Sequence, residues 1–390
     1  MTNGNARVHY LDNASTTHPK PASILEGLLQ FCSAGCLSPG RSGFDLALGA
    51  QEMVSDTRRR MCRLLGGTDP NRLVFGYNAT DALNLVIFGI LRRGGHVVAS
   101  RLDHNAVLRP IAHCVDEFGA TVTLVGFDRR GYIDPGDVAR AIRPDTKLVV
   151  LTHGSNVLGT VQPVAEVGAI CRERGVPFCI DAAQTAGMIP IDMRAMHVDM
   201  VAFTGHKSLL GPMGIGGLCV GPDVVIPHSR AGGTGVKSAE RRQPEEYPYR
   251  LECGTPNVMG ITGLHRGLEY IESQGGPAAI HAREMRLAEI LWRGLREIDG
   301  VTLYGAEDLE ARTPVFAFNI RGFDCEEAGR RLDTDFHVAC RTGLHCAPLV
   351  HEGIGTAPRG AIRFSLGPLT EPEDVEAGLA GVRALAAERR

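Results

Sequence analysis

RLVFGYNATDALNLVIFGILRRGGHVVA, residues 72–99, places two short apolar runs on either side of one longer apolar segment. Arg72–Phe75 and His96–Ala99 have the length of buried strands, and Thr80–Leu91 has the length of a helix. A strand, a helix and a second strand in this order form a unit whose two strands lie parallel in one sheet. The stretch therefore predicts an α/β fold.

The same alternation of short apolar runs and helix-length segments continues along the chain and ends near residue 220. Further strands are expected at Thr121–Val125, Lys147–Leu151, Pro177–Ile180, Asp199–Phe203 and Ile215–Val220, and further helices at Asn105–Phe118 and Val164–Arg174. With the first two strands this makes a seven-stranded sheet. Because helices separate most of the strands, we expect the sheet to be mostly parallel and covered by helices on both faces.

The rest of the chain has a different organisation. Gly221–Pro256 is rich in glycine, proline and charge, which predicts an ordered loop region with some short structure. After it, helices are expected at Val258–Gln274, Ala278–Leu295, Glu326–Asp333 and Pro372–Glu388, and strands at Val315–Ile320 and Ala361–Ser365. We expect a large domain of residues 15–260, and a smaller α+β domain of residues 1–14 and 261–390.

Composition excludes several classes of function. The chain has 390 residues, of which 44% are hydrophobic and 22% charged, and its formal net charge is -3. This balance gives no electrostatic case for binding nucleic acid or an anionic membrane. No run reaches the roughly 18 apolar residues of a membrane span. The N-terminus lacks the basic start and apolar stretch of a signal peptide, so we expect a cytoplasmic protein.

Cysteine usage agrees with that location. The 11 cysteines are odd in number and scattered, which argues against a secreted disulfide framework. Cys32 and Cys36 are the closest pair, but no second pair or histidine cluster completes a metal site. Most of the cysteines are therefore expected to be small buried apolar residues, and no metal is expected.

Polar residues follow the predicted strands, at the edge where open α/β sheets bind ligands. Lys207 is either a solvated surface lysine or a covalent anchor for a ligand. Asp181 is either a helix N-cap or the partner of a cationic ring nitrogen. His104 is either structural or stacked on a ring, and Gly76–Asp81 offers a helix N-terminus to a phosphate unless Thr80 is only its N-cap. Together these are the parts of a pyridoxal phosphate (PLP) site.

The order and spacing of these motifs resemble the class V aminotransferase family of fold-type I PLP enzymes, and within it the cysteine desulfurases. The likeness runs from Tyr10-Leu-Asp-Asn-Ala-Ser-Thr-Thr17 to Ile362-Arg-Phe-Ser365. Its strongest pieces are Asp181-Ala-Ala-Gln184, Gly205-His-Lys207 and Arg341-Thr-Gly-Leu-His-Cys346.

The resemblance implies a role for each cofactor-binding residue. Lys207 would hold PLP as a Schiff base and later remove the substrate's α-proton. Asp181 would pair with the pyridine nitrogen, Gln184 would bond the ring oxygen, and His104 would stack on the ring. The phosphate would be bound by Ala79, Thr80, Thr204 and His206, and by Thr255 of a neighbouring subunit. That last contact implies a homodimer with shared active sites.

The substrate would be bound, on the same resemblance, by Asn13, Asn156, Arg341 and Arg363. Arginine offers the planar fork that a carboxylate fits. For Arg363 the plain alternative is a charge on the surface of a strand.

Cys346 separates the subfamilies. Its plain alternative is an inert thiol, although Arg341 and His345 beside it in the sequence could favour the thiolate. In a desulfurase its thiolate would take the sulfur of L-cysteine, release L-alanine, and pass the persulfide to an unidentified sulfur-acceptor protein. The short segment around Cys346 resembles the group II enzymes, which include selenocysteine lyases. A selenocysteine lyase, a C–S lyase, an aminotransferase and an inactive scaffold stay open as alternatives.

The chain also departs from the group II pattern at three places. Ser38–Gly43 stands where a histidine-rich turn is usual before a long helix. The phosphate turn is Asn78–Asp81 rather than the usual threonine- and glutamate-bearing form, and Leu344 replaces a common second histidine. These departures leave the acceptor open, and they remove no group that the chemistry needs.

Overall fold

The computed structural model describes residues 7–35, 39, 45–305 and 307–388. Its main sheet has the strand order β2-β8-β7-β6-β5-β3-β4. The strands are β2 (Leu73–Gly76), β3 (Gly95–Ser100), β4 (Ala120–Val125), β5 (Thr146–Thr152), β6 (Phe178–Asp181), β7 (Met200–Thr204) and β8 (Gly216–Val220). Only β8 runs against its neighbours, so the predicted mostly parallel sheet is confirmed.

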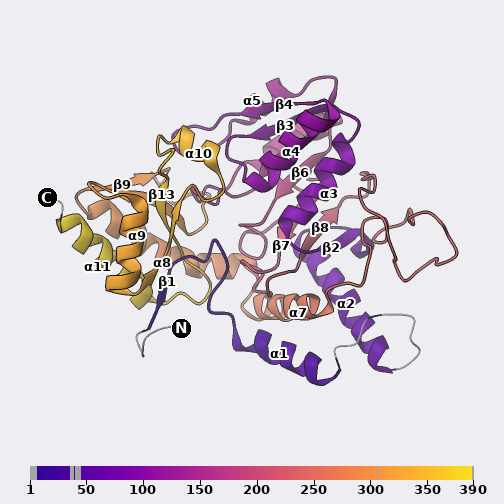
Figure 1. Cartoon of the computed structure of the whole chain (residues 1–390), viewed down its shortest axis with the longest axis horizontal. Coiled ribbons are helices and arrows are strands. Elements are labelled where there is room, and N and C mark those ends of the chain that lie inside the picture. Colours follow the sequence, from indigo (N-terminus) through magenta and orange to yellow (C-terminus); the bar gives the residue numbers. More distant parts are fainter. Residues whose placement is uncertain (1–6, 36–38, 40–44, 306, 389–390) are drawn as a thin grey trace.

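Helices cover both faces of this sheet (Figure 1). One face carries α3 (Ala79–Leu91) and α4 (Asn105–Phe118). The other face packs against α1 (Ala22–Ser33), α2 (Asp45–Leu64), α6 (Val164–Arg174) and α7 (Val258–Ser273), with α5 (Pro135–Ala141) beside α6.

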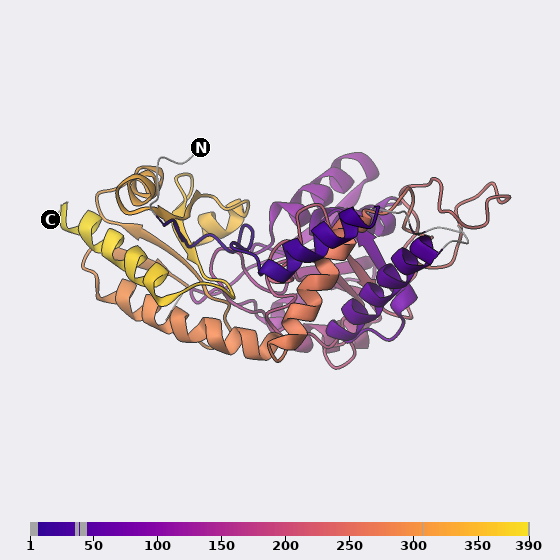
Figure 2. The same ribbon diagram turned by 90° about the horizontal axis from the view of Figure 1, so that it is seen from below.

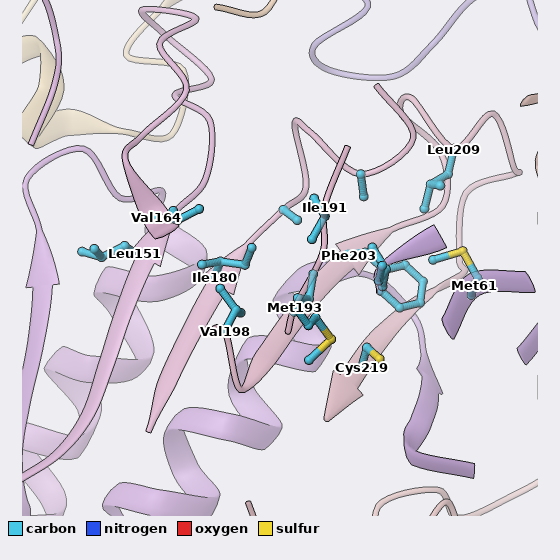
Figure 3. Close-up of a cluster of buried hydrophobic side chains, with 14 of the residues drawn as sticks. Met61, Leu151, Val164, Ile180, Ile191, Met193, Val198, Phe203, Leu209 and Cys219 are labelled. Atoms are coloured by element: carbon cyan, nitrogen blue, oxygen red, sulfur yellow. The ribbon is translucent and has the colours of Figure 1, made fainter. Parts of the chain in front are cut away.

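Alternate strand residues supply the two cores, because successive side chains of a strand point to opposite faces. Val150 and Cys179 belong to the core under α3 and α4. Their neighbours Leu151 and Ile180 belong to the opposite core, where Figure 3 shows them together with Phe203 of β7. The sheet is therefore buried on both sides, as the continuous apolar strands predict.

The C-terminal part forms a second unit with its own core (Figure 1). Its antiparallel sheet has the order β12-β13-β10-β9. These strands are β9 (Val301–Tyr304), β10 (Val315–Ile320), β12 (Arg341–Gly343) and β13 (Ala361–Ser365). Its helices are α8 (Pro277–Glu297), α9 (Cys325–Phe336), α10 (Pro348–Gly353) and α11 (Pro372–Glu388), and β1 (His9–Tyr10) pairs with β11 (Val338–Ala339) beside them. Figure 2 shows α7 and α8 following one another from the large sheet to this unit. The two cores are separate, but α7 packs on the large sheet, so our division into residues 15–260, and 1–14 with 261–390, stays a prediction.

Several details differ from the sequence predictions. Residues 221–257 contain no helix or strand and extend from the large sheet (Figure 1). Helices α1, α2, α5 and α10, and the short strands β1, β9, β11 and β12, were not predicted. The unusual turn at Ser38–Gly43 lies outside the described residues apart from Pro39. Within the part of the chain that is described, no helix is both long enough and apolar enough to span a membrane.

Candidate active site

A cavity of about 270 Å³ lies where the carboxyl ends of the large sheet face the C-terminal unit. It gathers most of the residues that the sequence singled out. Ala79, Thr80, His104, Asn156, Asp181, Gln184, Thr204, His206, Lys207, Arg341, Cys346 and Arg363 all line it. The cavity therefore joins residues that lie more than 280 positions apart in the chain.

Asp181 and Lys207 lie at the ends of neighbouring strands of the large sheet. Asp181 is 5% exposed and accepts a hydrogen bond from the main-chain N–H of Ala183 at 2.9 Å. Only turns follow it, so the alternative of a helix N-cap is wrong. Burial raises the pKa of Asp181, and the bond from Ala183 and the charge of Lys207 oppose the shift. The carboxylate thus favours a cationic partner in the cavity.

Lys207 is not a surface lysine, because it lines the cavity and is only partly exposed. Burial lowers its pKa to about 8; Asp181 opposes this shift, and Arg363 and Arg341 add to it. A lysine with a lowered pKa has a larger neutral fraction, which both Schiff-base formation and proton abstraction require.

The phosphate side of the cavity is the N-terminus of α3. The N-cap is Asn78, whose Oδ1 accepts from the main-chain N–H of Asp81 at 2.9 Å, so the N-cap alternative for Thr80 is wrong. Thr204 Oγ1 and His206 Nδ1 are buried without a hydrogen-bond partner among the described residues. Unpaired buried polar atoms are rare and costly, and an anionic ligand in the cavity would satisfy both.

The charge of Asp81 does not oppose an anion at this turn. Its carboxylate accepts from the main-chain N–H of Tyr77 at 3.0 Å and pairs with Arg230 Nη1 at 3.1 Å. The neighbouring His206 is neutral near pH 7, because burial lowers its pKa to about 4 and Lys207 and Lys20 add to the shift.

His104 caps α4 and also lines the cavity. Its Nδ1 accepts from the main-chain N–H of Ala106 at 3.0 Å, so the ring proton lies on Nε2. Burial, with the charges of Lys207 and Arg341, lowers the pKa of His104 to about 4. His104 can therefore cap α4 and also stack on a ring in the cavity, since its neutral side chain is fixed at the cavity wall. Gln184 is fixed by a bond from its Nε2 to the carbonyl of Ala14 at 3.0 Å.

Arg363 is buried, which rules out the alternative of a strand-surface charge. It is 1% exposed and contacts the carbonyl of Asn156 at 2.9 Å, Asp12 Oδ1 at 2.6 Å and Ser15 Oγ at 2.9 Å. Its Nε has no partner in the described chain. Burial lowers the pKa of Arg363, with Asp12 opposing. A fixed guanidinium of this kind can bind a carboxylate.

Cys346 lies exposed at the cavity, on a turn between β12 and α10. Arg341 Nη2 lies 3.7 Å from its Sγ. His345 and Cys346 both have left-handed backbone, with φ of 49° and 57°. The main-chain N–H of Asn105 donates to the carbonyl of Cys346 at 2.8 Å and holds the turn against α4. Left-handed residues other than glycine are uncommon and mark functional turns.

The expectation that His345 favours the thiolate is wrong. Its ring points away from Cys346: Nδ1 lies 3.1 Å from His351 Nε2, and His351 Nδ1 lies 2.7 Å from Thr356 Oγ1. Burial lowers the pKa of His345 to about 2, and Arg363 adds to this. A neutral ring that faces another element cannot supply the positive charge. Arg341 is the group in contact with the thiol.

Only one arrangement of donors and acceptors satisfies this row of hydrogen-bonded side chains. Thr356 donates to His351 Nδ1, His351 Nε2–H donates to His345 Nδ1, and His345 Nε2–H donates to the carbonyl of Arg341 at 3.5 Å. The opposite order would set the lone pair of His345 Nε2 against that carbonyl. The chain thus supports the cysteine turn from behind.

Two predicted site residues lie outside this cavity. Asn13 is buried: its Nδ2 donates to the carbonyl of Ser365 at 3.2 Å, and its Oδ1 accepts from the N–H of His18 at 3.2 Å. Both ends of its amide are used, so the structure does not bring Asn13 to a substrate. Thr255 is exposed and lines a second cavity of about 570 Å³.

Sequence reasoning missed Asp12 and Ser15. Ser15 Oγ donates to Asp12 Oδ1 at 2.8 Å and accepts from Arg341 Nη1 at 2.9 Å. Asp12 and Ser15 stand inside the Tyr10–Thr17 motif, which was the available signal for both.

The residues around the cavity fit PLP. An unpaired hydroxyl and an unpaired ring nitrogen lie near a helix N-terminus, where a phosphate binds. A buried carboxylate suits a protonated ring nitrogen, and a lysine with a lowered pKa suits an aldehyde.

Comparison with known proteins identifies the family. The model of the family described as aminotransferase class-V matches residues 9–377. The chain is 32% identical over 373 residues to a probable cysteine desulfurase of Methanothermobacter thermautotrophicus, covering 94% of this chain and 92% of that protein. It is 30% identical over 347 residues to a cysteine desulfurase of Escherichia coli O157:H7, with coverage of 87% and 84%.

A solved structure agrees with these relatives. The apo structure of cysteine desulfurase from Thermococcus onnurineus NA1 matches with a TM-score of 0.90 and 30% identity, over 98% of this chain and 95% of that chain. This likeness confirms the expected fold-type I architecture and the resemblance to cysteine desulfurases. The chain therefore belongs to the class V aminotransferase family, whose members depend on PLP.

Proposed function

We propose that this protein is a PLP-dependent cysteine desulfurase, which converts L-cysteine to L-alanine and collects the sulfur as a persulfide on Cys346. One observation carries the proposal: an exposed thiol lies on the wall of the same cavity as Lys207 and Asp181. An aminotransferase or a simple lyase needs the lysine and the aspartate, but it has no use for the thiol.

The chain's own residues provide the steps around the substrate. Arg363 binds the substrate carboxylate, and Lys207 removes the α-proton as a neutral amine. PLP, when bound, supplies an electron sink for the resulting carbanion. Asp181 would hold the proton on the ring nitrogen of PLP, and the neutral ring of His104 lies at the cavity wall.

Sulfur transfer then takes place at Cys346. Its thiolate attacks the substrate sulfur, a new S–S bond forms, and the C–S bond breaks with its electron pair staying on carbon. That carbon is protonated and leaves as the methyl group of L-alanine. The overall change is L-cysteine plus a thiol giving L-alanine plus a persulfide, and it needs no external oxidant.

The same proposal extends to the partners. Because Cys346 is exposed, an acceptor protein can reach the persulfide, and its short turn between β12 and α10 favours the group II type. Thr255 is exposed and does not line the cavity that contains Lys207. This position suits a contact with the cofactor of a neighbouring subunit in a homodimer. The ten cysteines of the described chain are all free, which is typical of a reducing, cytoplasmic location.

Mass spectrometry of Cys346 after incubation of the PLP-loaded protein with L-cysteine tests the proposal. We expect a gain of one sulfur atom on Cys346 and the release of L-alanine. Cys346→Ala should abolish alanine formation, whereas Cys32→Ala, at another exposed cysteine, should leave it unchanged. If Cys346→Ala still released sulfide from L-cysteine at the full rate, the protein would be a lyase. A higher kcat/KM with selenocysteine would instead identify a selenocysteine lyase.

A further inference from the structure

The hydroxyl of Ser15 makes three hydrogen bonds at the cavity wall. It donates to Asp12 Oδ1 at 2.8 Å and accepts from Arg341 Nη1 and Arg363 Nη2, both at 2.9 Å. One donor bond and two acceptor bonds are the full capacity of a hydroxyl. Ser15 therefore has nothing left to offer a substrate, and its role must act through the two arginines.

We infer that Ser15 is a positioning residue that holds Arg341 against Cys346 and so favours the thiolate for sulfur transfer. The inference deepens the proposed function, and its last step rests on that function. The geometry at the wall is direct, because Nη1 of Arg341 bonds Ser15 while Nη2 lies 3.7 Å from Cys346 Sγ.

The two arginines depend on Ser15 to different degrees. Arg363 keeps Asp12 at 2.6 Å and the carbonyl of Asn156 at 2.9 Å if the hydroxyl is lost. Arg341 has no carboxylate within ion-pair distance among the described residues, and its hydrogen bonds go to Ser15 and Cys346. Removing the hydroxyl therefore releases Arg341 and leaves the proposed carboxylate site in place.

Among the charged groups around the thiol, Arg341 is the one that contacts its sulfur atom. Lys207, Asp181, His104 and Arg363 line the same cavity from the large sheet, α4 and β13. His104 is neutral near pH 7, since burial lowers its pKa to about 4. Arg341 alone among these groups is within hydrogen-bond distance of Cys346 Sγ in the described chain. A cation at this distance stabilises a thiolate relative to the thiol.

Hydrogen bonds from main-chain N–H groups hold the backbone around Ser15, so removing the hydroxyl should not unfold this segment. The N–H of Ala14 donates to Ser365 Oγ at 2.9 Å, the N–H of Ser15 to the carbonyl of Asp12 at 3.1 Å, and the N–H of Thr17 to the carbonyl of His206 at 3.1 Å. A Ser15→Ala variant therefore keeps the fold of this segment.

Alkylation of Cys346 in the PLP-loaded protein tests the inference directly. The rate is followed at the Cys346 peptide by mass spectrometry, from pH 6 to 10, with iodoacetamide. For Ser15→Ala we expect a pH midpoint higher by roughly 0.5–1 unit and a rate at neutral pH lower by roughly 3–10-fold, since the thiolate is the nucleophile. Ser15→Thr, which keeps a hydroxyl, restores the wild-type midpoint. Ser273→Ala, at an exposed serine of α7, serves as the control.

Steady-state kinetics with L-cysteine provide the second readout. We expect Ser15→Ala to lower kcat by about tenfold and to change KM by less than about twofold, because only sulfur transfer is affected. An unshifted alkylation midpoint in Ser15→Ala would overturn the inference, and so would a raised KM at unchanged kcat. A wild-type protein that alkylates as expected but forms no persulfide would contradict the proposed function and leave the positioning of Arg341 intact.

Discussion

The side-chain amide of Asn156 donates to the main-chain carbonyl of His345 at 2.7 Å. The main-chain carbonyl of Asn156 in turn accepts from Arg363 Nη1 at 2.9 Å. One residue of the loop after β5 thus holds both the turn that carries Cys346 and the arginine proposed for the substrate carboxylate. The sequence suggested only a contact between Asn156 and the substrate.

Asn156→Ala is expected to loosen the cysteine turn rather than only weaken substrate binding. It leaves a buried carbonyl without its donor, which costs about 1–3 kcal/mol of unfolding free energy. The contact to Arg363 survives because it uses the main chain. Chemical denaturation and single-turnover persulfide formation measure the two effects, with Asn71→Ala, at an exposed residue of the short 3-10 helix Pro70–Arg72, as the control. A higher KM with normal stability and a normal persulfide rate would contradict this role.

The buried histidines behind the cysteine turn make the protein sensitive to acid. Burial lowers the pKa of His351 to about 4 and that of His345 to about 2, whereas a histidine of an unfolded chain titrates near 6.5. Between these values the unfolded chain binds more protons, so the free energy of unfolding falls as the pH falls below about 6.5. Denaturation curves from pH 7 to 4.5 measure the slope.

His351→Asn removes one of these titrating groups, and we expect it to flatten the slope by up to about 1.4 kcal/mol per pH unit. The exposed His113→Asn should leave the slope as in the wild type. Equal slopes in all three proteins would show that His351 does not stay neutral in the fold.

Thr204→Val separates cofactor binding from folding. Its buried hydroxyl has no partner in the described chain, so the cofactor-free protein should be equally stable or slightly more stable without it. The affinity for PLP should fall by roughly tenfold or more, since a hydrogen bond to a charged group is worth about 1.5–3 kcal/mol. Equilibrium titration with PLP and thermal unfolding give the two values, with the exposed Thr302→Val as the control. Unchanged PLP affinity would place the phosphate elsewhere.

Glu284 in α8 should be a site where the protein can be stabilised. It is 2% exposed, and neither carboxylate oxygen has a hydrogen-bond partner among the described residues. Burial raises its pKa well above the usual range, so the folded protein holds a proton that the unfolded chain releases above about pH 4.3. The resulting stability is lost as the pH rises.

Glu284→Met should therefore raise the free energy of unfolding at pH 8 by about 1–3 kcal/mol, and by less at pH 4. Glu289→Gln, on the exposed face of the same helix and paired with Arg293, is the matched control. A Met variant less stable than the wild type at pH 8 would mean that the carboxylate is satisfied in solution.

The large sheet could be predicted because its strands are continuous apolar runs separated by helix-length segments. Val97 and Val98 face opposite cores, so both faces of the strand are buried and its centre is a continuous apolar run. Short strands gave no such signal. Arg341–Gly343 in β12 and the two residues of β1 are too short and too polar to show a period.

The site was predictable as a set of residues but not as a set of contacts. Asp181 and Lys207 could be identified because each follows a predicted strand. The carboxyl ends of parallel strands meet at one edge of the sheet, whatever the conformation of the loops. The direction of His345 could not be read from its place beside Cys346, because two left-handed residues in succession turn its ring to the far side. The Ser15 contacts link segments more than 320 positions apart, and no local pattern encodes such a distance.

The left-handed backbone at Cys346 has a consequence for engineering this protein. A side chain in that conformation costs roughly 1–3 kcal/mol, and glycine relieves the cost. A redesign that ranked substitutions by stability alone would therefore choose Cys346→Gly early and discard the sulfur nucleophile. Folding would gain from a change at a position where the reaction tolerates none, so activity and stability must be selected together.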